Sequence, residues 1–131
     1  MSELFNHAII TTNYDCLFEQ AFDTGAEKAF RVISGINALA APAADGVSII
    51  KLHGDVKVPA NCILSRNQYD QAYGSGAVDL TLPITRLLEF HYRNSNLLFL
   101  GCSLNNDRTV HVFRAIKKHI GDAVLPQHFA K

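Results

Sequence analysis

Three polar clusters, each placed directly after an apolar run, contain the residue types that could do chemistry in this chain. They are Asn13 with Asp15, His53 with Gly54 and Asp55, and Gly101 with Ser103 and Asp107. Histidine titrates near neutral pH and can therefore move a proton. Asparagine and aspartate can orient a substrate or a water molecule, and glycine lets the backbone approach a ligand closely. The sequence therefore raises the question of whether these clusters belong to one site.

The elements that must position these clusters follow from the hydrophobic pattern. Strands are predicted at residues 8–12, 29–34, 47–52 and 97–100, with weaker ones at 62–65 and from 123 to 130. Helices are predicted from residue 14 to a C-cap at Gly25, and over residues 66–73, 80–92 and 110–120. The last helix has Asn106 or Asp107 as its expected N-cap. Strands that alternate with helices predict an α/β fold around a mainly parallel sheet.

The three clusters all follow the carboxyl ends of predicted strands, which is where open α/β sheets bind their ligands. If these strands are parallel neighbours, the clusters converge on one crevice. Ser103 precedes a predicted helix N-terminus and could bind a phosphate there. The pattern therefore favours a single ligand site at one edge of the sheet.

Composition limits the class of protein. The chain has 131 residues, 48% of them hydrophobic, with 12 basic and 12 acidic residues, which is typical of one globular domain. This balance gives no reason to expect nucleic acid or a membrane surface as a partner. No apolar run approaches the about 20 residues of a membrane-spanning helix, and the N-terminus has no secretory pattern. The three cysteines have no paired spacing, which favours a reducing, cytoplasmic setting.

The segments TTNYD, KLHGD and LFLGCSLNND, in this order, resemble the landmarks of sirtuin-like NAD-binding domains. They are most similar to the bacterial branch found in anti-phage defence proteins, including the Thoeris systems. The resemblance covers residues 9 to about 120 and implies a Rossmann-like fold that binds NAD. In the defence branch the usual activity is cleavage of the nicotinamide–ribose bond. Classical sirtuins break the same bond in order to deacylate lysine.

The resemblance also implies roles for individual residues. His53 would be the catalytic general base near the ribose hydroxyls, and Asn13 would position water or the ribose. The residues implied to bind NAD, here the substrate, are Thr12, Asn13, Asp15, Gly54, Gly101, Ser103 and Leu104. Cleavage passes through an oxocarbenium-like state, as glycoside hydrolysis does, and nicotinamide leaves as a neutral group. Positioning and electrostatics should therefore dominate the catalysis.

Two features of the family are missing from the sequence. One is the first strand with its Gly-Ala-Gly-x-Ser loop, which is expected to cradle the pyrophosphate. The other is the four-cysteine zinc module of classical sirtuins, so we expect no metal site and disfavour protein deacylation. Residues 1–131 are therefore expected to be the C-terminal part of one larger sirtuin-like domain. Poor solubility or self-association is expected of this fragment, and whether it is active or inactive by itself stays open.

Other interpretations stay open. The chain could be a non-catalytic nucleotide-binding remnant, or a module that needs a partner chain to supply the Gly-rich segment. His53 could be a packed strand-end histidine, and Cys102 a packed small side chain. Asn13 and Asp15 could form only a turn and a helix cap, and the segment from Ser103 has the same ambiguity. The sequence leaves the oligomeric state open, and a homo-oligomer is one of the alternatives.

Overall fold

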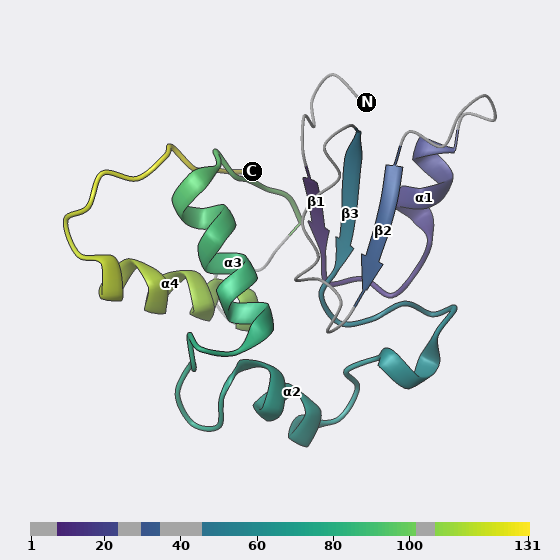
Figure 1. The fold of residues 1–131 in the computed structure, drawn as a ribbon, viewed down its shortest axis with the longest axis horizontal. Helices are drawn as coiled ribbons and strands as arrows, with labels where there is room; N and C mark the ends of the chain where they lie inside the picture. The colour runs from purple at the N-terminus through teal and green to yellow at the C-terminus, as the bar shows by residue number, and fades with distance from the viewer. Residues whose placement is uncertain (1–7, 24–29, 35–45, 102–106) are drawn as a thin grey trace. The chain divides into compact units, whose positions relative to one another are not determined.

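The computed structural model of the chain describes residues 8–23, 30–34, 46–101 and 107–131. The chain divides into two compact units, Met1–Ser65 and Arg66–Lys131. The first unit contains β1 (Ala8–Thr11), α1 (Leu17–Phe22), β2 (Phe30–Ser34), β3 (Val47–Lys51) and a short 3-10 turn, η2 (Pro59–Asn61). The second contains α2 (Arg66–Tyr73), α3 (Pro83–Asn94), β4 (Leu98–Phe99), α4 (Arg108–Ile120) and β5 (Phe129–Ala130). Figure 1 labels its helices.

The sheet of the first unit is parallel, in the order β1-β3-β2 (Figure 1). Its register pairs Ile9 with Ile49 and Ile33 with Ile50. The central strand β3 is buried at all five positions, which explains why its sequence VSIIK is nearly continuous in apolar residues instead of alternating. Both neighbours of β3 run in its direction, so the carboxyl ends of all three strands lie at the same edge of this sheet.

Helix α1 covers one face of this sheet through aromatic side chains at helical spacing. Phe22 packs with Ile9 and Ile49 in a buried cluster, and Phe18 and Phe30 lie against it. The helix begins at Leu17 and not at residue 14 as expected, because the residues before it form a turn. This later start leaves the TTNYD segment at the carboxyl end of β1 as a loop.

The second unit has its own core, to which α3 contributes Leu88 and α4 contributes Val112 and Ile116, all completely buried. The rings of Tyr92 and Phe113 stack with centroids 5.3 Å apart. Strands β4 and β5 form a two-stranded parallel sheet. None of the helices in the described part of the chain is long and apolar enough to cross a membrane.

The predicted fold class is confirmed: the chain is a mixed α/β protein with parallel strands flanked by helices, in keeping with a Rossmann-like fold. The helix predicted over residues 66–73 is also confirmed. The strand predicted at 62–65 is wrong, because Cys62 ends the 3-10 turn and its N–H bonds the Pro59 carbonyl. The helix expected from residue 80 begins only at Pro83, since Asp79 and Thr81 close a turn before it.

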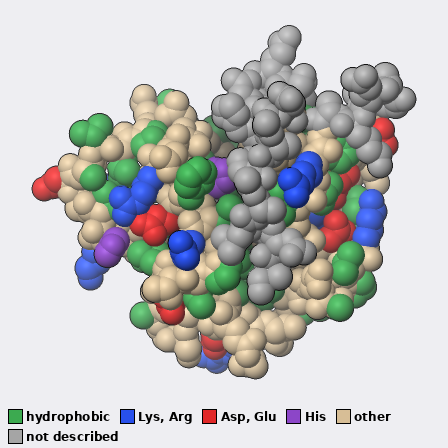
Figure 2. All heavy atoms as spheres, viewed as in Figure 1, with side chains coloured by type: hydrophobic (Ala, Val, Ile, Leu, Met, Phe, Trp, Pro, Cys, Tyr) green, Lys and Arg blue, Asp and Glu red, His purple; other side chains and the backbone are tan. Residues whose placement is uncertain are grey.

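Surface charge agrees with the balanced composition. On the face drawn in Figure 2, the Lys and Arg side chains of the described residues are interspersed with Asp and Glu. The prediction that nucleic acid is not a partner rests on this mixture of signs and stays a prediction.

Candidate functional site

The carboxyl ends of β1 and β3 lie side by side, and this brings two of the three clusters together. Thr11 and Lys51 are partners in the register, and the Leu52 N–H donates to the Thr11 carbonyl at 2.9 Å just past the strand end. Beyond the strands, the Val56 N–H donates to the Tyr14 carbonyl, also at 2.9 Å. The segments TTNYD and KLHGD are therefore neighbouring loops, which we call the Asn13 loop (residues 12–16) and the His53 loop (residues 52–63).

The Asn13 loop is a tight turn with outward-facing polar side chains. The Asn13 N–H donates to Thr11 Oγ1 at 3.1 Å, and the Asn13 side chain is exposed. Asp15 is also exposed, and its Oδ1 accepts from the Leu17 N–H at 3.1 Å, in the first turn of α1. The turn that the sequence left open is thus present, but the N-cap of α1 is Cys16 and not Asn13 or Asp15. Binding of NAD by Thr12, Asn13 and Asp15 stays a prediction.

His53 follows β3 and is buried, with 7% of its surface exposed. Its ring centroid lies 6.3 Å from that of Tyr14 in the neighbouring loop. Its carbonyl accepts from the Ile63 N–H at 2.8 Å, and the Tyr14 hydroxyl donates to the Ile63 carbonyl. Histidine, tyrosine and the returning chain at Ile63 therefore hold one another in place, and the histidine ring adjoins the Asn13 loop.

Residue 54 must be a glycine because another part of the same loop, at Asn61 and Cys62, passes close to it. Its φ is +104°, a conformation that side-chain-bearing residues rarely adopt. A Cβ at this position would lie 2.6 Å from the Asn61 carbonyl oxygen and 2.7 Å from Cys62 Cα. The structure thus gives this glycine a packing reason that the sequence did not indicate, and its contact with NAD remains a prediction.

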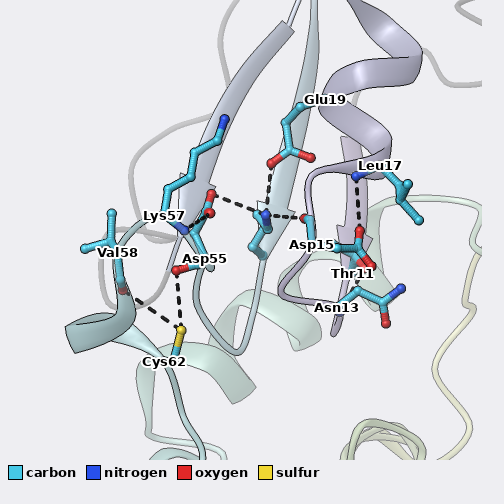
Figure 3. A network of polar contacts seen from close by, with 10 residues as sticks. Thr11, Asn13, Asp15, Leu17, Glu19, Asp55, Lys57, Val58 and Cys62 are labelled. Carbon is cyan, nitrogen blue, oxygen red and sulfur yellow. Dashed lines mark hydrogen bonds and ion pairs between the residues drawn. The ribbon is translucent and has the colours of Figure 1, made fainter.

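A buried ion cluster, which the sequence reasoning missed, lies beneath the two loops (Figure 3). Lys51 is completely buried, and its Nζ lies 2.9 Å from Glu19 Oε1 and 3.2 Å from Asp55 Oδ2. It also donates to the Asp15 carbonyl. The sequence does contain one indication of this cluster, a lysine inside the apolar run SIIKL. A charged side chain at a buried strand position is stable only when it is paired with other polar groups.

The cluster shifts the pKa values of its members in opposite directions. Burial alone would lower the pKa of Lys51, but its contacts with Glu19 and Asp55 outweigh burial and raise it above 10.5. Burial alone would raise the pKa of Asp55, but the Lys57 N–H and the Lys51 ammonium outweigh burial and lower it below 3.8. Both groups are therefore charged across the neutral range.

Asp55→Asn should reduce the free energy of unfolding by about 1–3 kcal/mol at pH 7, because the Lys51 ammonium loses a charged partner. The pKa of Asp55 is lowered by folding, so its contribution is complete above pH 3.8 and is lost as the pH falls through the lower folded value. Urea unfolding at pH 7 and at pH 3 should show the difference between wild type and variant shrinking in acid. A difference that stays constant would contradict a charged Asp55 in this cluster.

The third cluster belongs to the second unit. Gly101 is exposed, follows β4 and has a φ of +65°. Asp107 is confirmed as the N-cap of α4, since its Oδ1 accepts from the Thr109 N–H at 2.7 Å. Ser103 and Leu104, like Cys102 and Asn106, lie outside the described residues. Each unit is placed only by itself, so convergence of this cluster on the other two stays a prediction.

Among the described residues, no three His, Cys, Asp or Glu side chains are grouped so that they could hold a metal ion. Cys16 and Cys62 are free thiols, and the Cys62 Sγ contacts the Asp55 carbonyl at 3.4 Å. The expectation that the protein works without zinc remains a prediction.

Comparison with known proteins identifies the family. The SIR2-like domain family matches residues 7–131. The NAD(+) hydrolase ThsA of Acinetobacter baumannii (strain 532279) is 27% identical to this chain over 109 residues. That match covers 83% of this chain but only 22% of the relative, so the chain spans about a fifth of that protein's length. The family match extends over nearly the whole sequence, and the chain therefore belongs to the SIR2-like domain family.

Proposed function

We propose that this chain is the NAD-binding and catalytic part of an NAD hydrolase that cleaves the nicotinamide–ribose bond. One observation carries the proposal: the Asn13 loop and the His53 loop are neighbours at one edge of a parallel sheet. A hydrogen bond from the Val56 N–H to the Tyr14 carbonyl joins them. Membership of the SIR2-like family and the similarity to an NAD(+) hydrolase support the choice of NAD as substrate.

The proposed reaction needs little covalent chemistry from the protein. The bond from ribose C1′ to the nicotinamide nitrogen breaks, and its electron pair leaves with neutral nicotinamide. The cationic ribose that develops is then attacked by water, which loses one proton and yields ADP-ribose. His53 would accept this proton, because imidazole binds protons near neutral pH. The exposed Asn13 amide would orient the water or the ribose against C1′.

For the other proposed NAD-binding residues, we propose which part of NAD they contact but no role in the reaction. Thr12, Asp15 and the backbone at Gly54 adjoin the same strand ends and would contact the ribose. Gly101, Ser103 and Leu104 would contact the phosphates or the adjoining ribose.

The biological setting is proposed from the relative. We infer that the chain is one SIR2-like domain of a bacterial anti-phage defence protein acting in the cytoplasm. A single family match that spans both compact units supports the one-domain assignment, and the free thiols of Cys16 and Cys62 suit a reducing compartment.

The test is to incubate the purified chain with NAD and to separate nicotinamide and ADP-ribose by chromatography. We expect both products in equal amounts, and we expect Asn13→Ala to lower the rate by about 10- to 100-fold without loss of stability, because its side chain is exposed. NAD binding is measured in parallel by NMR chemical-shift changes. Binding without turnover would favour the non-catalytic nucleotide-binding module, and the absence of both would refute the proposal.

A further inference from the structure

We propose that Lys51 is a positioning residue that fixes the Asn13 loop against the His53 loop. The inference rests on the proposed function, because it assigns Lys51 to the same site, although Lys51 itself is not placed in contact with NAD. Its side chain is completely buried, whereas Asn13, in one of these loops, is exposed. A lysine at this point of a central strand calls for an explanation, since an apolar side chain would fill the core at a lower desolvation cost.

The ammonium group of Lys51 joins three segments of the chain. It contacts the Asp15 carbonyl in the Asn13 loop, Glu19 Oε1 in α1 at 2.9 Å, and Asp55 Oδ2 in the His53 loop at 3.2 Å. Figure 3 shows Asp15, Glu19 and Asp55 approaching from these separate segments. An ammonium has three N–H donors, and three acceptors surround this one, so the cluster accounts for all of its hydrogen-bonding capacity.

The cluster is shielded from water, which makes its geometry well defined. The side chains of Glu19 and Asp55 are each only 9% exposed, and that of Lys51 is not exposed at all. In such surroundings electrostatic attraction is strong, and a polar group left without its partner is costly. Any movement of one loop away from the other would therefore break a buried charged contact.

Both proposed reacting groups depend on this contact. Asn13 lies two residues before Asp15, and His53 lies two residues before Asp55 and two after Lys51. Two uncharged bonds also join the loops: the Val56 N–H donates to the Tyr14 carbonyl, and the Tyr14 hydroxyl donates to the Ile63 carbonyl. Lys51 adds the charged link between them. A misplacement of about 1 Å between reacting groups can cost about 100-fold in rate, so a loosened link should reduce turnover more than binding.

The first variant is Lys51→Met, which keeps the length of the side chain and removes the charge. It leaves Glu19 and Asp55 as buried carboxylates without their cation, and it could fail to fold for that reason alone. The second variant is therefore the triple substitution Lys51→Met, Glu19→Gln and Asp55→Asn, which removes all three charges together. The matched control is Ile49→Ala, a cavity at a completely buried position of the same strand.

Two readouts separate positioning from general stability, both taken well below the unfolding temperature. For the triple variant we expect kcat for nicotinamide release to fall at least 30-fold while KM changes less than about threefold, a split typical of lost transition-state positioning. The Ile49→Ala control should keep kcat within about threefold. Amide hydrogen exchange at Val56 should quicken at least 10-fold in the triple variant, relative to the amides of β3.

Unchanged kcat and unchanged Val56 exchange in the folded triple variant would overturn the inference and leave Lys51 a purely structural residue. Equal losses in the triple variant and in Ile49→Ala would overturn it too, because general destabilisation would then explain both. If the wild-type chain releases no nicotinamide, the proposed function fails. The exchange of Val56 still decides whether Lys51 links the loops, since that readout needs no NAD.

Discussion

His53→Ala is expected to reduce kcat/KM for nicotinamide release by at least about 100-fold, because general acid–base groups contribute about 100- to 10,000-fold to enzymatic rates. His53 is the histidine that the structure places beside the Asn13 loop, with its ring 6.3 Å from that of Tyr14. Alanine cannot accept the proton of the attacking water. The measurement is initial-rate kinetics by chromatographic assay of nicotinamide between pH 6 and pH 8.

A matched control comes from His91, a histidine of α3 that is also 7% exposed. His91→Ala deletes an equally buried imidazole in the second unit, so it reports the cost of the cavity without removal of the proposed base. We expect this variant to lose stability and to keep most of its turnover per folded molecule. Similar losses of turnover in both variants, or full activity in His53→Ala, would remove His53 from the mechanism.

Gly54→Ala is expected to destabilise the protein by about 3 kcal/mol or more, since backbone strain and overpacking each cost about 1–3 kcal/mol. The strain arises because the φ of +104° disfavours any side chain. The overpacking arises because the new methyl group would lie 2.6 Å from the Asn61 carbonyl oxygen, a backbone atom that cannot rotate away. Urea denaturation followed by circular dichroism measures the loss.

Gly121→Ala provides the comparison, because Gly121 also has a positive φ, of +65°, but no atom lies within 4 Å of the position of its Cβ. It should cost only the backbone penalty, about 1–3 kcal/mol, because its φ of +65° and ψ of −131° form a conformation that residues with a side chain rarely adopt. We also expect Gly54→Ala to lower nicotinamide release, since the His53 loop must rearrange. Equal destabilisation by the two substitutions would show that the Asn61–Cys62 segment yields easily and that Gly54 does not fix the loop.

Much of the local structure was predictable because it depends on neighbours along the chain. Helix α2 over Arg66–Tyr73 and the Asp107 cap of α4 follow from side-chain spacing and from hydrogen bonds to adjacent residues. The start of α1 was placed too early, since the apolar spacing from Leu17 onward does not show that the residues before it form a turn, in which Asp15 Oδ1 accepts from the Leu17 N–H. The strand expected at residues 62–65 was also wrong. Its first residue, Cys62, ends the 3-10 turn η2, and the spacing of apolar residues does not show this turn.

The sequence by itself determined the α/β class, the buried strand before His53 and the candidates His53 and Asn13, because hydrophobic period and residue type carry that information. Only the tertiary structure decided that β1 and β3 are neighbours, so that two loops far apart in the chain share one edge. It also revealed the partners of Lys51, which come from α1 and from the loop after β3. Contacts between residues distant in sequence depend on strand order and register, and a pattern read along one chain does not specify these.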